Sequence, residues 1–342
     1  MSLYELLERL SNAYGVSGSE SDVRKLIVSE IEPYVDTVKV DKMGNMTCHR
    51  KGTGPSIMLA AHMDEIGLLV KEIDKDGHIF FSLIGGISEE TLAAHPVHIL
   101  GTKGVVHGVI TFDYLHLGLR PEKYPKYYEM YADTGLSKKE LEKAGVSVGA
   151  YMIAERRLTR LGKSNIISGK SLDDRIGCAM LIELARRIKK AGVKANVYFV
   201  FTVQEEVGLY GARASMYSFD PACALAVETT TSHDYEDTGV GLGHGPSITI
   251  KDAEFITNRI LTEYIVGLAK KNKIPYQVEV SDFGTTDALA ISLSKGGVPA
   301  GVVSVPVRNI HSTVGIADLD DIENGLKLLF EFLKSPPKSC IG

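Results

Sequence analysis

The sequence contains no tryptophan, and its four cysteines are scattered without a CxxC pair. Such sparse cysteines exclude a disulfide-stapled secreted domain and favour reduced thiols in a cytoplasmic protein. No apolar run approaches the roughly 20 residues of a membrane-spanning helix, so we expect no membrane partner. The first residues, MSLYELLERLSNAYG, lack the basic start and apolar run of a secretory signal. We therefore expect a cytoplasmic location.

An excess of positive charge is also missing. The 38 basic residues are outnumbered by 43 acidic ones, which gives a formal net charge of −5. Acids and bases are interleaved along the chain, so the basic footprint of a nucleic-acid-binding protein is absent and we expect no nucleic-acid partner. With 342 residues, 44% of them hydrophobic, the chain can bury one large core or two moderate ones.

Apolar strands and amphipathic helices alternate through much of the chain. Two helices open it, the first capped by Ser2 and the second ended by Pro33. Further helices are expected over 176–190, 256–271 and 322–333, and strands in SIMLAAHMDEIG, at 197–203, in CALAVE and in AGVVSVPV. This pattern predicts an α/β fold, with a mostly parallel mixed sheet covered by helices on both faces.

Residues 68–163 interrupt this pattern with short strands and Gly-rich turns, and with little helix outside the charged segment SKKELEKAG. A β-rich block of this size within an α/β chain predicts an inserted second domain. We therefore assign residues 1–67 and 164–342 to one α/β domain and residues 68–163 to an inserted β-rich domain.

Histidine or acidic side chains end five separate segments of the α/β pattern. In an open α/β sheet, ligands collect beyond the carboxyl ends of the strands. Each residue alone has an ordinary explanation, such as a helix cap for Asp173 and Asp174 or a surface position for a strand-end histidine. The candidates at these five ends are His62 with Asp64, Asp173 with Asp174, Glu205 with Glu206, Glu228, and His311.

A cluster of this composition predicts bound metal. Burying several acids together without a cation would be prohibitively expensive. Two histidines with several carboxylates and no thiolate suit Zn²⁺, Co²⁺ or Mn²⁺. A shared carboxylate could join two such ions roughly 3.5–4 Å apart, with a bridging water whose pKa falls toward 7.

The stretch FVFTVQEEVGLYGA contains two adjacent acids directly after a strand. Neighbouring strand residues point to opposite faces, so Glu205 and Glu206 can share one site only if the strand stops before them. Gly208 and Gly211 indicate that it does stop. One acid could then bind metal while the other accepts a proton from the water.

The motifs AAHMDEIG, LDDRIG, VQEEVG and VRNIHS, with a strand that ends in an acid, resemble the TET and glutamyl-aminopeptidase group, metallopeptidase family 42. The resemblance covers nearly the whole chain, including the insertion. It implies a dinuclear metal-dependent aminopeptidase that removes amino-terminal residues from peptides. It also implies a homo-oligomer, built of dimers that are often joined into hollow tetrahedral dodecamers through the inserted domain.

The same resemblance implies a role for each residue. Asp173 would bridge the two metals, Glu206 and His311 would complete one of them, and His62 and Glu228 the other. Glu205 would be the general base. Asp64 would orient the imidazole of His62, which lies two residues earlier on the same face of its strand, whereas Asp174 would be structural.

Two positions depart from the family pattern. Glu228, in VETT, stands where family members commonly have Asp, and the extra methylene changes the geometry of the second metal. After His311 the chain has STVG where SP and an acid are commoner, which changes the rim of the pocket.

Some other features carry weaker expectations. The segment FGTTDALAISLSKGG resembles a family segment that lines the substrate cleft, although a helix capped by Thr285 or Thr286 is an equal alternative. The histidines of the insertion are irregularly spaced and are expected to be surface or interface residues: His95, His98, His107 and His116.

Three other functions are alternatives to the aminopeptidase: a glycosidase, a related deacylase or carboxypeptidase, and an inactive binding protein. Some similar proteins carry an endoglucanase name, but a glycosidase needs two carboxyl groups facing each other across a sugar, usually with aromatic platforms. The absence of Trp and the grouping of acids with histidines fit that poorly. A related metal-dependent deacylase or carboxypeptidase would share the core but not the insertion. An inactive binding protein would not need all five ligands and Glu205.

Overall fold

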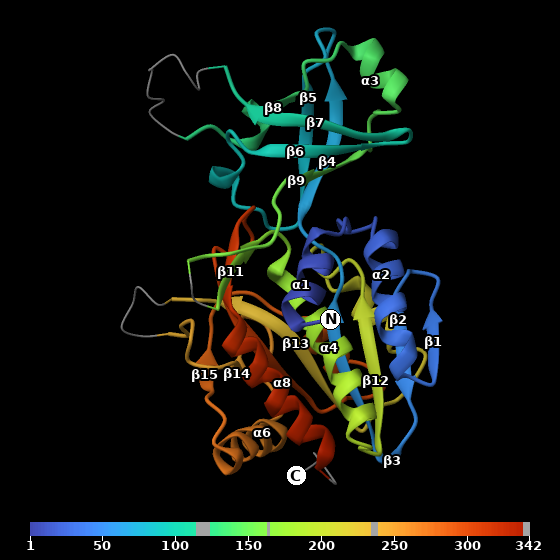
Figure 1. Cartoon of the computed structure of the whole chain (residues 1–342), viewed down its shortest axis with the longest axis vertical. Helices are drawn as coiled ribbons and strands as arrows, with labels where there is room; N and C mark the ends of the chain where they lie inside the picture. Colours follow the sequence, from blue (N-terminus) through green and yellow to red (C-terminus); the bar gives the residue numbers. More distant parts are fainter. Residues whose placement is uncertain (114–123, 163–164, 234–238, 338–342) are drawn as a thin grey trace.

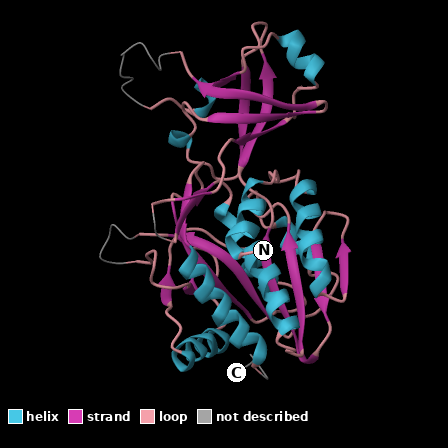
Figure 2. Ribbon diagram, viewed as in Figure 1, coloured by secondary structure: helices cyan, strands magenta, loops and turns pink. Residues whose placement is uncertain are grey.

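The structure is a computed structural model that describes residues 1–113, 124–162, 165–233 and 239–337. It has two parts, a large sheet with helices packed against it and a smaller barrel beyond one end of that sheet (Figures 1 and 2). In the described part of the chain, no helix is both long enough and apolar enough to cross a membrane.

The large sheet is mixed. From one edge, its strands are β1 (Thr37–Val40), β2 (Met46–Arg50), β12 (Ala195–Thr202), β3 (Thr53–His62), β13 (Cys223–Thr231), β16 (Ala300–Arg308), β17 (Gly315–Asp318), β11 (Ile166–Gly169) and β10 (Thr159–Arg160). β14 (Ser247–Lys251) also pairs with β16, and β15 (Gln277–Val280) pairs with β14.

At the centre of this sheet β12, β3, β13 and β16 run in one direction, and β15 also runs parallel to β14. The outer pairs β1–β2, β2–β12, β16–β17, β17–β11 and β11–β10 are antiparallel. The sheet is therefore mixed, as the sequence predicted, with antiparallel pairs toward its edges. Short connections such as those between β1 and β2 and between β16 and β17 can join only antiparallel strands.

Helices cover both faces of the sheet, as expected. One face packs against α1 (Leu3–Asn12), α2 (Ser21–Ile31), α4 (Leu172–Lys190), α6 (Arg259–Asn272) and α8 (Leu319–Lys334). The other packs against the short helices α5 (Tyr210–Ser215) and α7 (Asp287–Ser292). Strand alternation produces the two cores, since Leu59 and Ala61 of β3 lie in the first and Met58 and Ala60 in the second.

Helix caps account for where several helices begin. Ser2 caps α1 and accepts the N–H of Glu5, as expected from the sequence. α6 begins at Arg259 rather than at residue 256, because the side chain of Asn258 accepts the N–H of Leu261. The second helix gives way to the 3₁₀ turn η1 (Glu32–Tyr34), which contains Pro33.

The smaller part is a closed barrel with strand order β4 (Gly67–Ile73), β5 (Ile79–Ile84), β8 (Tyr131–Asp133), β7 (Gly104–Thr111), β6 (Pro96–Gly101) and β9 (Tyr151–Ala154). It has its own apolar core, which includes Phe81, Ile99 and Met152. The charged segment SKKELEKAG forms α3 (Lys138–Ala144), and two further 3₁₀ turns are η2 (Glu89–Thr91) and η3 (Tyr127–Glu129). The expected domain boundary at residues 163–164 lies outside the described residues, as do His116 and Cys340.

Candidate metal centre

The carboxyl ends of the central strands open into a cleft of about 660 Å³. The register of the paired strands determines which residues face this cleft. β3 ends at His62, which is paired with Thr202, the last residue of β12. On the other side of β3, Ala226 of β13 is paired with Ala60, so Glu228 lies level with His62 and on the same face. His62 and Glu228 therefore face the cleft from neighbouring strands.

Asp173 lies between two imidazoles. Its Oδ1 is 3.2 Å from Nε2 of His62, and its Oδ2 is 3.4 Å from Nε2 of His311. Asp173 comes from the beginning of α4, where its backbone and that of Asp174 depart from helical angles. Each carboxylate oxygen of Asp173 thus faces a different histidine.

The remaining acids lie on the two sides of Asp173, some near His62 and one near His311. Oε2 of Glu228 is 3.7 Å and Oε2 of Glu205 is 3.9 Å from Nε2 of His62. Oε2 of Glu206 is 3.5 Å from Nε2 of His311, which lies in the connection between β16 and β17 and has φ 57°. All five residues expected to hold metal, together with Glu205, are gathered in one place.

The turn after β12 brings both adjacent glutamates to the cleft. β12 ends at Thr202, and Gln204 has a positive φ of 53°, so the strand alternation stops before the acids. The backbone N–H groups of Glu205 and Glu206 donate to the two carboxylate oxygens of Asp64, at 3.0 and 3.2 Å. Asp64 also lies 3.5 Å from Nδ1 of His62, so it contacts both the histidine strand and the glutamate turn.

Asp174 is fully buried, and its Oδ1 accepts the N–H of Gly177 in the first turn of α4. Gly177 has no room for a side chain, because a Cβ there would lie 2.3 Å from the carbonyl oxygen of Val227 on β13. The glycine of LDDRIG therefore lets α4 begin directly against the strand that carries Glu228.

The electrostatics of the cluster favour a bound cation. Burial raises the pKa of Glu206 to about 8 and raises the pKa of Glu205 and Glu228 well above the ordinary value. Contact with Asp173 in turn raises the pKa of His311 to about 9. Carboxylates buried together resist ionisation unless a cation compensates them.

Orphaned polar atoms in the cluster lead to the same conclusion. Among the described residues, Oε1 of Glu206 and Oε1 of Glu228 are buried without a hydrogen-bond partner. Buried polar atoms are normally satisfied, so these atoms are available to a ligand. A donor set of imidazole nitrogens and carboxylate oxygens fits divalent ions such as Zn²⁺, Co²⁺ or Mn²⁺.

Sequence reasoning missed three supporting hydroxyls. Thr229 donates to Oδ1 of Asp173 at 2.8 Å, and Ser17 donates to Oδ2 of Asp64 at 2.6 Å. Thr202 donates at 2.5 Å to Asp287, a fully buried acid at the beginning of α7 whose pKa burial raises to about 6. A serine, a threonine or a helix-start aspartate has too many ordinary uses to be selected from sequence.

Comparisons with known proteins find similarity to aminopeptidases. Residues 44–328 match the family model described as M42 glutamyl aminopeptidase. The lysyl aminopeptidase of Pyrococcus furiosus is 36% identical, over 97% of this chain and 97% of the relative. A TET aminopeptidase from a marine-sediment thaumarchaeon has a solved structure with a TM-score of 0.93 and 35% identity, covering 98% of this chain and 97% of that chain.

Two further solved structures bear on assembly and on an alternative function. The TET1 peptidase of Pyrococcus horikoshii, described as assembling into a tetrahedron or a large octahedral shell, has a TM-score of 0.89 and 32% identity, over 98% of this chain and 100% of that one. A Thermotoga maritima protein named endoglucanase has a TM-score of 0.79 and 34% identity, over 96% of both chains.

Proposed function

The chain belongs to the M42 glutamyl aminopeptidase family and is a peptide-bond hydrolase, and from this premise we propose that it works through two divalent cations in the strand-end cluster. Asp173 would contact both ions. Glu206 and His311 would complete one site, and His62 and Glu228 the other. The position of Asp173, with one oxygen near each histidine, is the observation that carries this proposal.

The bound cations would supply an activated water and polarise the scissile carbonyl. The chain's own residues would then move the protons. Glu205 lines the cleft next to His62 and would accept the proton of the attacking water and pass it to the leaving amine. Burial raises the pKa of its carboxyl above the ordinary value, which makes it a stronger proton acceptor.

Asp64 would act by positioning rather than by touching substrate. It lies fully buried behind His62 and holds the backbone of the Glu205 turn by hydrogen bonds. A carboxylate behind a metal-binding histidine fixes the ring's orientation and strengthens it as a ligand. Oε2 of Glu228 is 3.7 Å from Nε2 of His62, which supports its place in the second site.

The endoglucanase alternative is less well supported by the site. Glycosidases need two carboxyl groups facing each other across the sugar ring. Here four carboxylates that line the cleft, Asp173, Glu205, Glu206 and Glu228, all lie within 4 Å of a histidine nitrogen. A related deacylase or carboxypeptidase would lack the barrel formed by β4 to β9, which this chain shares with its TET neighbour.

A direct assay separates these functions. The purified protein should hydrolyse aminoacyl-nitroanilides, lose this activity with chelator and regain it with Zn²⁺, Co²⁺ or Mn²⁺. N-acetylated peptides should not be cleaved, since an aminopeptidase must bind a free amine. Release of reducing sugar from carboxymethyl-cellulose that persists in chelator would favour the endoglucanase instead.

The cleft wall further suggests which amino-terminal residues are preferred. Two divalent cations would balance the charges of Asp173, Glu205, Glu206 and Glu228, and the wall carries two more acids, Asp252 and Glu279. Among the described residues that line the cleft, none is a lysine or arginine. The wall would therefore be negative with metals bound, which favours a basic side chain at the amino terminus of the substrate.

The position of Glu279 supports this preference. Its carboxylate accepts hydrogen bonds from the hydroxyls of Thr230, Ser247 and Thr249, at 2.6 to 3.1 Å. Thr230 lies on the same face of β13 as Glu228 and two residues further on, roughly 7 Å along the strand. A lysine or arginine side chain can span that distance. The similarity to a lysyl aminopeptidase is in line with this.

A substrate panel tests the preference. Lysyl-nitroanilide should be hydrolysed with a higher kcat/KM than the leucyl or glutamyl compound, and Glu279→Gln should lower kcat/KM for the lysyl compound by roughly 10–100-fold. Asp282→Asn is the matched control, because its side chain is 87% exposed and pairs with Lys251. A glutamyl preference in the wild type would overturn the assignment while leaving the aminopeptidase activity in place.

We also propose that the protein is a homo-oligomer, since the TET1 peptidase that it resembles is described as assembling into large shells. The family resemblance further implies that assembly occurs through the barrel. Light scattering coupled to size exclusion would measure the mass in solution. A monomer at micromolar concentration would contradict this part of the proposal.

A further inference from the structure

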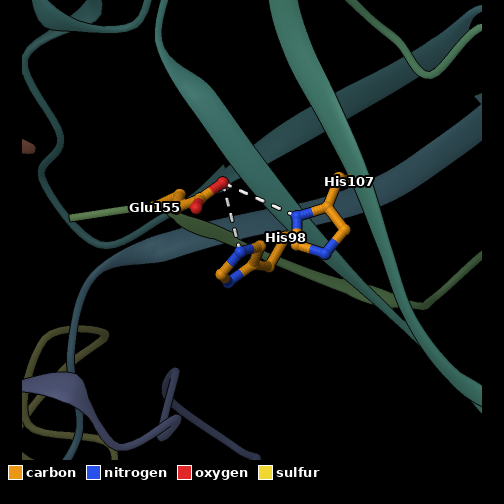
Figure 3. A group of neighbouring side chains, drawn as sticks. All are labelled: His98, His107 and Glu155. Carbon is orange, nitrogen blue, oxygen red and sulfur yellow. Dashed lines mark ion pairs between the residues drawn. The ribbon is translucent and has the colours of Figure 1, made fainter. Parts of the chain in front are cut away.

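A second group of side chains of types that can bind a metal ion lies in the barrel: His98, His107 and Glu155 (Figure 3). His98 on β6 and His107 on β7 are direct cross-strand partners, so their side chains share one face. Ile153 of β9 is paired with His98 on the other side, and Glu155, two residues beyond Ile153, returns to that face. The strands β6 and β7 and the residue that directly follows β9 thus bring His, His and Glu together, on the side opposite the barrel's apolar core.

The distances in this group are those of ligands around an ion. Oε2 of Glu155 lies 3.2 Å from Nε2 of His98 and 3.6 Å from Nδ1 of His107, and the three atoms lie within 4.8 Å of one another (Figure 3). Nε2 of His98 is buried yet makes no hydrogen bond, even to this carboxylate. Metal bonds of about 2.0–2.1 Å at tetrahedral angles place ligand atoms roughly 3.3 Å apart.

The cleft contains the same spacing between histidine and carboxylate, with distances of 3.2 to 3.7 Å around His62 and His311. By contrast, His78 and Asp74 in the same barrel form an ordinary hydrogen bond of 2.9 Å. The outer cluster therefore resembles the candidate metal centre rather than a surface ion pair.

A residue from the large sheet domain supports one of the rings. The hydroxyl of Tyr14, which follows α1, lies 2.9 Å from Nδ1 of His98. This bond leaves Nε2, the nitrogen next to Glu155, to act as the ligand. Metal-binding histidines characteristically use their second nitrogen in this way.

We propose that His98, His107 and Glu155 bind one zinc-like divalent transition-metal ion, separate from the cleft. Three protein ligands leave the fourth position to water, and the 71% exposed side chain of His107 leaves the site accessible from solvent. The ion would join β7, β6 and β9 and, through Tyr14, fasten the barrel to the sheet domain. The insertion's histidines at 98 and 107 are then ligands, not only the surface residues that their spacing suggested.

Zinc stoichiometry in the full-length protein tests the proposal. After equilibrium dialysis against buffered zinc, elemental analysis should find one equivalent fewer per chain in His107→Gln than in the wild type. Turnover on aminoacyl-nitroanilide should be unchanged, because His107 lines no part of the cleft. The zinc-dependent rise in Tm should also be smaller in the variant. Equal zinc content in the two proteins would overturn the proposal.

Two further variants separate ligation from folding. His78→Gln removes a histidine of the same barrel that pairs with Asp74, and it should keep the full zinc content. Tyr14→Phe should weaken the extra equivalent by about 10–100-fold without abolishing it. An unchanged zinc affinity in Tyr14→Phe would show that Tyr14 does not couple this metal site to the sheet domain. Because the readout is zinc content, the result stands whether or not the protein cleaves peptides.

Discussion

The backbone N–H of Glu205 donates a hydrogen bond of 3.0 Å to Oδ1 of Asp64. This bond joins the end of β12 to the end of β3, and the neighbouring N–H of Glu206 reinforces it at 3.2 Å. Two adjacent acids can face one cleft because their backbone is turned and held by a buried carboxylate. Asp64 is therefore as much a backbone anchor as a partner of His62.

Replacing this anchor should impair both metal binding and rate. In Asp64→Asn, an amide N–H₂ replaces one of the two oxygens that accept N–H groups, so one backbone hydrogen bond is lost. We expect kcat/KM to fall by roughly 10–100-fold, with weaker metal retention. Ser17→Ala removes only the 2.6 Å hydroxyl bond to Asp64 and should have a smaller effect. Equal activity of Asp64→Asn and wild type would show that the anchor is dispensable.

Glu205→Gln should separate chemistry from metal binding. The amide cannot accept the proton of the attacking water, so turnover should fall by roughly 10²–10⁴-fold. Metal content, measured by elemental analysis, should stay at the wild-type level. The adjacent Glu206→Gln is the matched comparison, because it should lose metal as well. A near-normal rate in Glu205→Gln would mean that another group is the base.

Metal binding should release protons at neutral pH. In the metal-free protein, contact with Asp173 raises the pKa of His311 to about 9, so the ring is protonated below that pH and cannot bind a cation. The metal must displace this proton, and apparent affinity should therefore rise as pH rises toward 9 and then level off. Calorimetry in buffers of different ionisation enthalpy would measure at least one proton released per chain.

His311→Ala provides the control for this measurement and should release fewer protons. A binding enthalpy that is the same in every buffer would contradict the raised pKa.

The candidate centre could be predicted because its signal lies in chain order. Each of the five strand or loop ends carries a histidine or acid, and parallel strands bring such ends to one edge. The sequence pattern alone did not show which outer strands run antiparallel to the central ones. The two strands paired with β16 in this way are β14 and β17. Nor could the sequence show that His98 and His107 are cross-strand partners, because strand register in the barrel depends on tertiary packing.

A buried ionic network next to the centre should dominate the stability of this region. Nζ of Lys170 lies 2.7 Å from Glu65, and Arg175, with a fully buried side chain, lies 3.2 Å from the same carboxylate. Glu65 also accepts a hydrogen bond from Ser171. The network therefore joins the segment between β3 and β4 to residues 170–175, which surround the beginning of α4 and include Asp173.

Glu65→Gln should be far more damaging than Lys170→Met. The first leaves the Arg175 guanidinium buried without its counter-charge, and breaking a buried pair in this way costs about 3–5 kcal/mol. The second removes an amine whose pKa burial already lowers to about 8, while Arg175 continues to neutralise Glu65. Chemical denaturation of both variants in chelator would measure the difference in unfolding free energy without a contribution from metal. Equal losses would mean that Lys170, not Arg175, is the main partner of Glu65.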